Sequence, residues 1–204
     1  MSKDFEIMGL FAVPLLKIKF KDHYKYNFPE VKKKDQKPDS WVKSLHTTFP
    51  DIPDNDPIVS SFVKDSLRKD LKDSLVNVFK EINLPDTIDF TNLWYNIYHD
   101  NQGQEKHSHL AFVGQIAPLW SGVYYNKNAS PTRFFRSDRL YRTQILPEAQ
   151  NTALDVCLAE NFSPEVEDGD ILIFPPYLEH SVASTPEHKN KMRMTFSFNI
   201  VVNS

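Results

Sequence analysis

The sequence predicts a mainly β fold with one flanking helix (α+β), of the sandwich or jelly-roll type. Residues 58–82 have the apolar spacing of a single long helix, and the chain after residue 88 divides into short strand-like segments separated by turn-forming residues. Phe, Tyr and Trp make up 13% of the 204 residues, which favours pleated, half-buried surfaces.

The first part of the chain is expected to support the sheet. Residues 9–20 read as an opening strand that Pro14 interrupts. Residues 21–57 are polar and rich in proline, so we interpret them as a surface excursion in which Trp41 and Phe49 anchor to the core. In the predicted helix, apolar side chains recur at three- and four-residue steps and form one stripe: Phe62, Val63, Leu67, Leu71, Leu75, Val78, Phe79 and Ile82.

The second part of the chain is expected to form the β core. The strand-like segments are 88–99, 120–126, 132–136, 141–146, 152–159, 169–175 and 192–202. A tight turn at Glu167–Asp170 precedes the buried segment that ends at Phe174 and Pro175. With no repeat or linker, we expect one domain over 1–204, comprising an N-terminal strand, loop and helix over 1–88 and the β core over 89–204.

Composition excludes several classes of protein. Lys plus Arg number 24 and Asp plus Glu 27, a net charge of −3 that argues against a general nucleic-acid binder. Only five glycines are present, which excludes a glycine-rich phosphate loop. The single cysteine, Cys157, suits a reducing compartment. Without a membrane-length apolar run or a signal-peptide pattern, we expect a cytoplasmic protein that does not enter a membrane.

Three histidines are candidate metal ligands. His107 and His109 are two residues apart, so on a strand both imidazoles point to one side. Such a pair also occurs by chance in polar loops, and His180 strengthens the prediction because it follows a buried strand and a short turn. An edge histidine that caps the turn is the alternative for His180.

The last strand contains a candidate anion-binding residue. Arg193, Thr195, Ser197 and Asn199 alternate with Met194, Phe196 and Phe198, so one face of this strand is polar. If the apolar face meets an outer layer, Arg193 and Thr195 point into the barrel. A buried arginine needs an anionic partner, and a ligand carboxylate is an attractive one. An exposed arginine on an edge strand is the alternative.

Taken together, these stretches resemble the 2-oxoglutarate- and Fe(II)-dependent oxygenases of the jelly-roll fold, also called the double-stranded β-helix, and specifically a small bacterial and phage group. The resemblance covers roughly residues 90–202 and is specific as a set. The matching residues are Asn92-x-Trp94-x-Asn96, His107-x-His109, Trp120 to Tyr125, Gly169 to Pro175, Leu178-x-His180-Ser181-Val182 and Arg193 to Asn199.

The resemblance implies a hydroxylase-type dioxygenase that uses Fe(II), 2-oxoglutarate as cosubstrate and O2, and that releases succinate. It implies His107, His109 and His180 as iron ligands and Arg193 as the partner of the far carboxylate of 2-oxoglutarate. Tyr98 and Tyr125 match positions near the cosubstrate; strand alternation lets only one of Tyr124 and Tyr125 face inward, and we expect it to be Tyr125. Asn92, Asn96 and Thr195 are further candidates for the same pocket.

Several alternatives remain open at this point. Most of these oxygenases use two histidines and a carboxylate, so Glu105 could replace His109 in the triad. A cupin-like three-histidine metalloprotein that does not use 2-oxoglutarate, a zinc site and a non-enzymatic interaction protein are the rival functions. Arg193 favours the oxygenase, since a cupin does not need it. The primary substrate, a peptide side chain or a metabolite, and the oligomeric state stay open.

Overall fold

The computed structural model describes residues 13–31, 35–110, 118–136, 161–184 and 191–202. Its elements, in chain order, are β1 (Leu16–Lys19), a short 3-10 helix η1 (His23–Lys25), β2 (His46–Thr47), α1 (Ser61–Glu81), β3 (Ile88–Tyr98), β4 (Gln104–His107), β5 (Trp120–Lys127), β6 (Thr132–Phe135), β7 (Asn161–Phe162), β8 (Asp170–Phe174), β9 (His180–Val182) and β10 (Arg193–Val202). The predicted strands at 141–146 and 152–159, with Cys157, lie outside the described residues.

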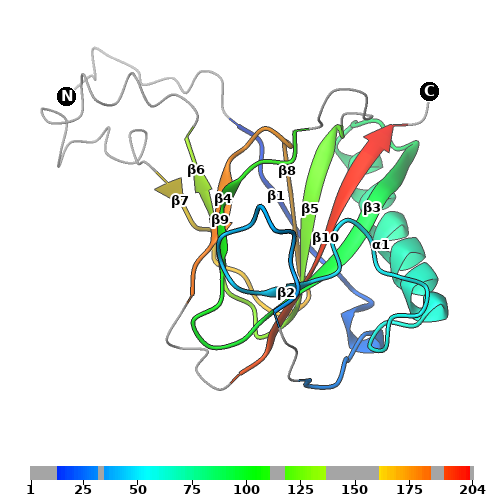
Figure 1. Cartoon of the computed structure of the whole chain (residues 1–204). Coiled ribbons are helices and arrows are strands. Elements are labelled where there is room, and N and C mark those ends of the chain that lie inside the picture. The colour runs from blue at the N-terminus through cyan, green and yellow to red at the C-terminus, as the bar shows by residue number, and fades with distance from the viewer. Residues whose placement is uncertain (1–12, 32–34, 111–117, 137–160, 185–190, 203–204) are drawn as a thin grey trace, which may run out of the picture.

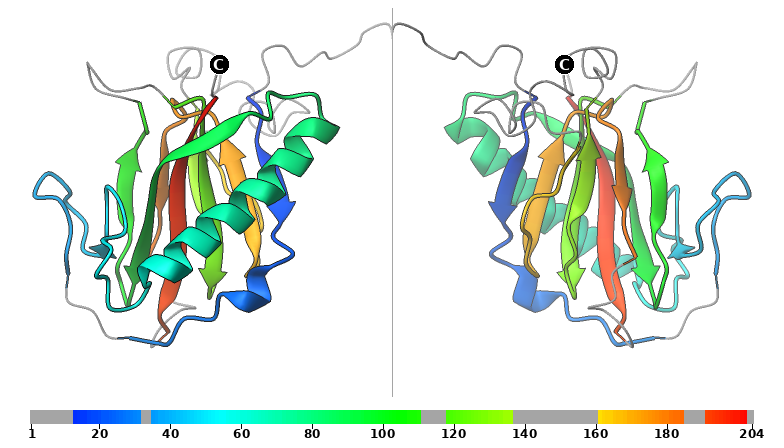
Figure 2. Two further views of the ribbon diagram at one scale, coloured as in Figure 1. Left: turned by 90° about the vertical axis from the view of Figure 1, so that its right-hand side faces the viewer. Right: turned by 90° about the vertical axis from the view of Figure 1, so that its left-hand side faces the viewer.

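The strands form two antiparallel sheets. The larger sheet has the order β1-β8-β5-β10-β3-β2, and the smaller sheet has the order β4-β9-β6-β7. Helix α1 runs across the outer face of the larger sheet, and the smaller sheet lies on the other side (Figures 1 and 2). This order of layers confirms the predicted mainly β fold with one flanking helix. Among the described residues, no helix is long and apolar enough to cross a membrane.

The two-residue period of the central strands divides the interior into two parts. In β10, Met194, Phe196, Phe198 and Ile200 pack under the helix in one apolar cluster. Arg193, Thr195 and Ser197 point to the other side and line a pocket between the sheets. A smaller apolar cluster that includes Val123, Tyr125 and Phe174 fills the rest of that inter-sheet space. The polar face of β10 therefore points inward, as its alternation predicts.

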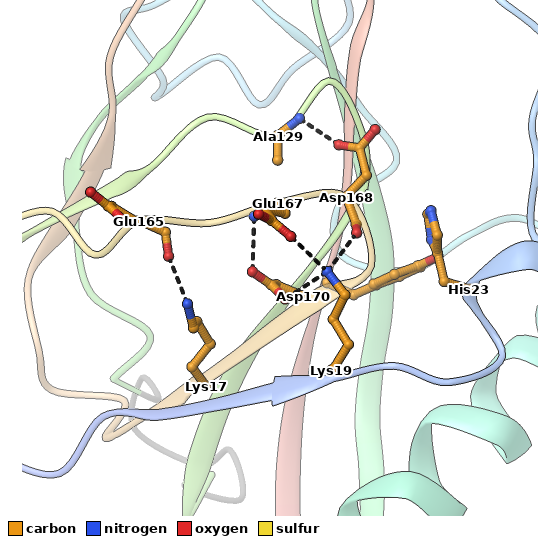
Figure 3. Close-up of polar contacts among 9 residues, drawn as sticks. Lys17, Lys19, His23, Ala129, Glu165, Glu167, Asp168 and Asp170 are labelled. Carbon is orange, nitrogen blue, oxygen red and sulfur yellow. Dashed lines mark hydrogen bonds and ion pairs between the residues drawn. The ribbon is translucent and has the colours of Figure 1, made fainter.

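The predicted turn before β8 fastens three segments of the chain together (Figure 3). Asp168 accepts hydrogen bonds from the amides of Asn128 and Ala129, at 3.1 and 2.7 Å. Lys19 of β1 contacts Asp170 at 3.2 Å and the carbonyl of Asp168 at 3.1 Å. Gly169 has a φ of 90°, a conformation that residues with a Cβ rarely adopt. The turn therefore fixes where β8 starts relative to β1 and β5.

Helix α1 begins later than the sequence predicts. The side chain of Ser60 accepts a hydrogen bond from the amide of Val63 at 3.4 Å and caps the first turn. Asp56 instead accepts hydrogen bonds from the amides of Ile58 and Val59 and from the hydroxyl of Tyr95. The predicted apolar stripe is buried at Leu67, Leu71, Leu75 and Phe79, whereas Phe62 is 78% exposed.

This difference gives a prediction for stability. Leu71→Ala should lower the free energy of unfolding by about 2–5 kcal/mol, because a fully buried side chain leaves a cavity under the helix. Phe62→Ala is the matched control and should change it by less than about 0.5 kcal/mol, because Phe62 already faces solvent. Urea denaturation followed by circular dichroism measures both; equal losses would contradict the packing of α1.

Candidate metal centre and adjoining pockets

The smaller sheet brings three histidines together. His107 ends β4 and lies opposite His180, the first residue of β9, in the strand register. His109 follows two residues after His107. One ligand atom from each imidazole lies within 4.8 Å of the other two, and the ring centroids are 4.2 to 5.3 Å apart. The three histidines singled out in the sequence therefore form one cluster.

Hydrogen bonds fix which nitrogen of His107 and His180 carries the proton. Nδ1 of His107 lies 2.8 Å from the carbonyl oxygen of Glu105, and Nδ1 of His180 lies 3.0 Å from that of Leu178. A carbonyl can only accept a hydrogen bond, so in both rings Nδ1 carries the proton. Nε2 then keeps its lone pair, as a metal ligand requires.

His109 is oriented by a small side-chain network on the larger sheet. Its Nδ1 lies 2.9 Å from the hydroxyl of Ser121 and 3.1 Å from the side-chain oxygen of Asn199. Ser121 donates its own proton to the same Asn199 oxygen at 2.9 Å. Nδ1 of His109 is therefore the donor, and its Nε2 is also left with a lone pair.

Burial keeps all three imidazoles uncharged. It lowers the pKa of His107, lowers the pKa of His109 to about 3 and lowers the pKa of His180 well below its ordinary value. At neutral pH the cluster therefore presents neutral nitrogen donors. Imidazole nitrogen suits Fe, Ni, Cu and Zn, so the donor set fits a first-row transition metal.

Glu105 lies outside this cluster. Its carboxylate accepts hydrogen bonds from the amides of Val42 and Lys43 at 3.0 and 3.1 Å. Burial by itself raises the pKa of Glu105, but hydrogen bonds from backbone amides outweigh it and lower the pKa overall. Within the described part of the chain, the group that could hold a metal consists of the three histidines.

An inner pocket lies between the two sheets beside the histidines. Tyr98, Tyr125, Arg193 and Thr195 all line it. The Tyr125 hydroxyl lies 2.6 Å from that of Thr132, and the Tyr98 hydroxyl donates to the side chain of Gln104 at 3.3 Å. Tyr124 belongs instead to the apolar cluster under the helix, as predicted from alternation.

The two candidate asparagines, Asn92 and Asn96, lie in different surroundings, and neither is among the residues that line the inner pocket. Asn96 is buried and donates to the hydroxyl of Ser197 at 3.2 Å. Asn92 lines a different space. The larger sheet twists along β3, and residues on the same face four positions apart reach different spaces.

Arg193 is a buried cation beside the histidines. It is 3% exposed, and its guanidinium carbon lies 4.9 Å from the ring centroid of Tyr98. Two of its nitrogens donate to the carbonyls of Ala183 at 3.2 Å and Gln102 at 3.0 Å. Among the described residues no carboxylate pairs with it. Burial lowers the pKa of Arg193, but a guanidinium stays charged in proteins.

A second space, the outer groove, begins at the same histidines and holds about 1490 Å³, its open mouth included. Trp41, Phe49 and Trp94 line it together with His107 and His109. We expected Trp41 and Phe49 to anchor the 21–57 segment to the core, but both line this groove instead. Phe49 is 42% exposed. Aromatic residues in a polar segment signal a binding surface as readily as an anchor, and the sequence alone did not separate the two.

His23, His46 and His188 stand in polar stretches of the sequence, which predict surface positions, but the structure treats them differently. His46 is buried and packs against Tyr95, with ring centroids 5.9 Å apart, so that prediction is wrong. His23 is half-buried, and its Nδ1 lies 2.7 Å from the hydroxyl of Tyr124. Both belong to segments whose partners are far away in the sequence. His188 lies outside the described residues.

Comparisons with solved structures identify the fold. The chain is similar to a prolyl-4-hydroxylase from Pseudomonas putida, at 11% identity and a TM-score of 0.50, over 83% of this chain and 78% of that one. HygX from Streptomyces hygroscopicus, solved with nickel, 2-oxoglutarate and hygromycin B, gives 14% identity and a TM-score of 0.52 over 94% and 84%. SnoN, an α-ketoglutarate-dependent epimerase of nogalamycin biosynthesis, gives 8% identity and a TM-score of 0.54 over 93% of this chain and 79% of that one. These similarities confirm the double-stranded β-helix.

A protein-family comparison identifies the function. No curated protein matches the sequence. The family described as "Putative 2OG-Fe(II) oxygenase" matches residues 92–199, which is more than half of the chain and includes every candidate ligand of the metal and the cosubstrate. The predicted oxygenase is thereby confirmed over the cupin-like alternative. The chain belongs to the 2-oxoglutarate- and Fe(II)-dependent oxygenases, and its cofactors are Fe(II), 2-oxoglutarate and O2.

Proposed function

We propose that His107, His109 and His180 hold the iron of this oxygenase and that Arg193 binds the far carboxylate of 2-oxoglutarate in the inner pocket. The supporting observation is the juxtaposition of three imidazoles with free Nε2 lone pairs and a buried guanidinium without an anionic partner among the described residues. A site with these two features fits a metal chelated by a dianionic cosubstrate.

The charges of the site support this assignment. Three neutral imidazoles leave the two positive charges of Fe(II) without compensation from the ligands. Arg193 adds a third positive charge in the same pocket, and burying it unpaired is costly. Dianionic 2-oxoglutarate compensates both centres, with one carboxylate at the metal and one at the guanidinium. These charges support the assignment of a ligand with two separated negative charges to this site.

The protein's own groups orient the cosubstrate and keep water away. Bound Fe(II) and 2-oxoglutarate supply the oxidising chemistry, in which O2 is consumed and 2-oxoglutarate becomes succinate and CO2. The backbone carbonyls of Gln102 and Ala183 hold the Arg193 guanidinium in place before the ligand arrives. Tyr98 and Tyr125, each 1% exposed, wall the pocket, which strengthens the charge interactions inside it.

The choice between His109 and Glu105 follows from their hydrogen bonds. Asn199 and Ser121 hold His109 with its Nε2 free toward the cluster. The Glu105 carboxylate is used by two backbone amides of the 41–43 segment, and moving it to a metal would leave those amides unpaired. We therefore assign the third iron ligand to His109. The reaction that we propose for this site is hydroxylation of a C–H bond.

The iron site gives one prediction. The wild-type protein should bind close to one equivalent of Fe(II) under anaerobic conditions, and His180→Ala and His109→Ala should each abolish tight binding because two imidazoles remain. Glu105→Ala is the matched control and should bind iron like the wild type. Anaerobic titration calorimetry measures all four. Loss of binding in Glu105→Ala with retention in His109→Ala would reverse the assignment.

Arg193 gives a second prediction. Adding 2-oxoglutarate to the anaerobic Fe(II) protein should produce a weak visible charge-transfer band from chelation. Arg193→Ala should weaken 2-oxoglutarate binding by about tenfold to a hundredfold, because a charge-assisted bidentate contact is lost. Arg193→Lys should recover only part, since a point charge does not replace the planar fork. Iron binding should survive both changes; an unchanged band in Arg193→Ala would contradict the assignment.

The depressed histidine pKa values give a prediction for the metal-free protein. An unfolded histidine has a pKa near 6.5, whereas that of His109 is about 3 in the native state. Below pH 6.5 the unfolded chain therefore binds a proton that the native protein does not, and stability falls as the pH falls through this window. His109 alone should cost about 2 kcal/mol between pH 7 and pH 5.

The measurement is the free energy of unfolding in urea at both pH values, in the presence of a chelator. His109→Gln removes the titrating group. Between pH 7 and pH 5, its free energy of unfolding should therefore fall by about 2 kcal/mol less than that of the wild type. Identical losses in the two proteins would show that His109 is protonated in the folded state.

A further inference from the structure

The outer groove has no role in binding iron or 2-oxoglutarate, yet it opens from the same site. His107 and His109 line both the inner pocket and the outer groove. On the basis of the proposed function, we propose that the outer groove binds the primary substrate and that this substrate is an uncharged peptide segment presenting an aliphatic side chain to the iron.

The lining of the groove selects against charge. Apart from the two histidines, which the proposed function assigns to the iron, none of the described residues that line it is ionisable. A charged group packed against the aromatic side chains would lose its hydration without gaining a counter-charge from a described side chain of the lining, which is unfavourable. A phosphate-bearing or polycationic ligand is therefore disfavoured.

The walls of the groove favour aliphatic C–H groups. Trp41, Phe49 and Trp94 form a continuous aromatic wall, with centroids 5.6 Å apart for Trp41 and Phe49 and 5.2 Å for Phe49 and Trp94. The wall reaches the histidines at both ends, since Trp94 lies 5.6 Å from His109 and Trp41 lies 6.4 Å from His107. An aliphatic side chain packed on this wall is held beside the metal ligands, where a C–H bond must be oxidised.

The polar groups of the groove suit amides. Asn92 and Ser108 offer neutral donors and acceptors along the lining, as the N–H and C=O groups of a peptide require.

The open mouth of the groove favours a chain over a small metabolite. Phe49 and Leu110 are 42% and 59% exposed and both line the groove. Exposed apolar groups at a binding site are typically covered by the ligand. A peptide continues beyond the aliphatic side chain that it inserts, and its neighbouring residues cover this apolar rim.

The reaction at this site balances without a further reagent. The substrate C–H, O2 and 2-oxoglutarate give the substrate C–OH, succinate and CO2. One oxygen atom of O2 enters the new hydroxyl group and the other enters succinate. The two electrons from the C–H bond and the two from decarboxylation reduce O2 completely.

The test uses a positional-scanning library of acetylated, amidated hexapeptides with the full-length Fe(II)-loaded protein. Pools with Ala, Val, Leu, Ile or Pro fixed at a central position should raise succinate formation about tenfold over the peptide-free rate and gain the mass of one oxygen atom. Pools with Asp, Glu, Lys or Arg fixed there should not. A charged pool as the best substrate, or no stimulation by any pool, would overturn the proposal.

Variants connect the stimulation to the groove. Trp41→Ala should reduce the stimulated rate at a given peptide concentration about tenfold or more, as for an aromatic anchor. Leu110→Asp places a charge on the exposed rim, where folding is not at risk, and should reduce it as well. Val42→Ala is the matched control, because Val42 is adjacent to Trp41, 85% exposed and outside the groove lining, and should behave like the wild type.

The visible band of 2-oxoglutarate on iron separates this proposal from the proposed function. All three variants should keep the band, because none of these residues lines the inner pocket. A band in the wild type with no peptide response would overturn the peptide proposal alone, whereas absence of the band would overturn the assigned 2-oxoglutarate site as well. If Trp41→Ala and Leu110→Asp leave the stimulated rate unchanged, the substrate does not bind in the outer groove.

Discussion

The alternation of β10 is the constraint on which the rest of the structure depends. Each residue facing the helix is apolar, and Arg193, Thr195, Ser197 and Asn199 face the other sheet. Burial of the apolar side under α1 stabilises the folded protein. This gain offsets the cost of burying polar groups on the other side of the same strand. A shift by one residue would place phenylalanines in the pocket and Arg193 under the helix.

The same strand also supplies side chains that contact both the inner pocket and the histidine cluster. Arg193 at its start lies in the inner pocket, and Asn199, six residues further on, orients His109. The other two histidines come from β4 and β9 of the smaller sheet, so the cluster forms only when both sheets are in place. The site is consequently a property of the complete fold, and no single segment of the chain contains it.

Much of this arrangement was predictable because it depends on local periodicity. Alternation lets only one of Tyr124 and Tyr125 face the pocket, and the helix and the two faces of β10 follow from periods of 3.6 or two residues. The position of Asn92 in the outer groove, the burial of His46 and the exposure of Phe49 do not. They depend on how segments distant in the sequence pack, and the 21–57 segment has almost no regular structure to impose a period.

The two spaces that meet at the histidines have opposite electrostatic requirements. The inner pocket contains a buried guanidinium, whereas the described lining of the outer groove is largely aromatic and, apart from the two histidines, has no ionisable side chain. The guanidinium of Arg193 favours a carboxylate, whereas the aromatic wall of the groove favours an uncharged group. On the proposed assignment, charge complementarity therefore distinguishes the cosubstrate from the substrate on the two sides of the metal site.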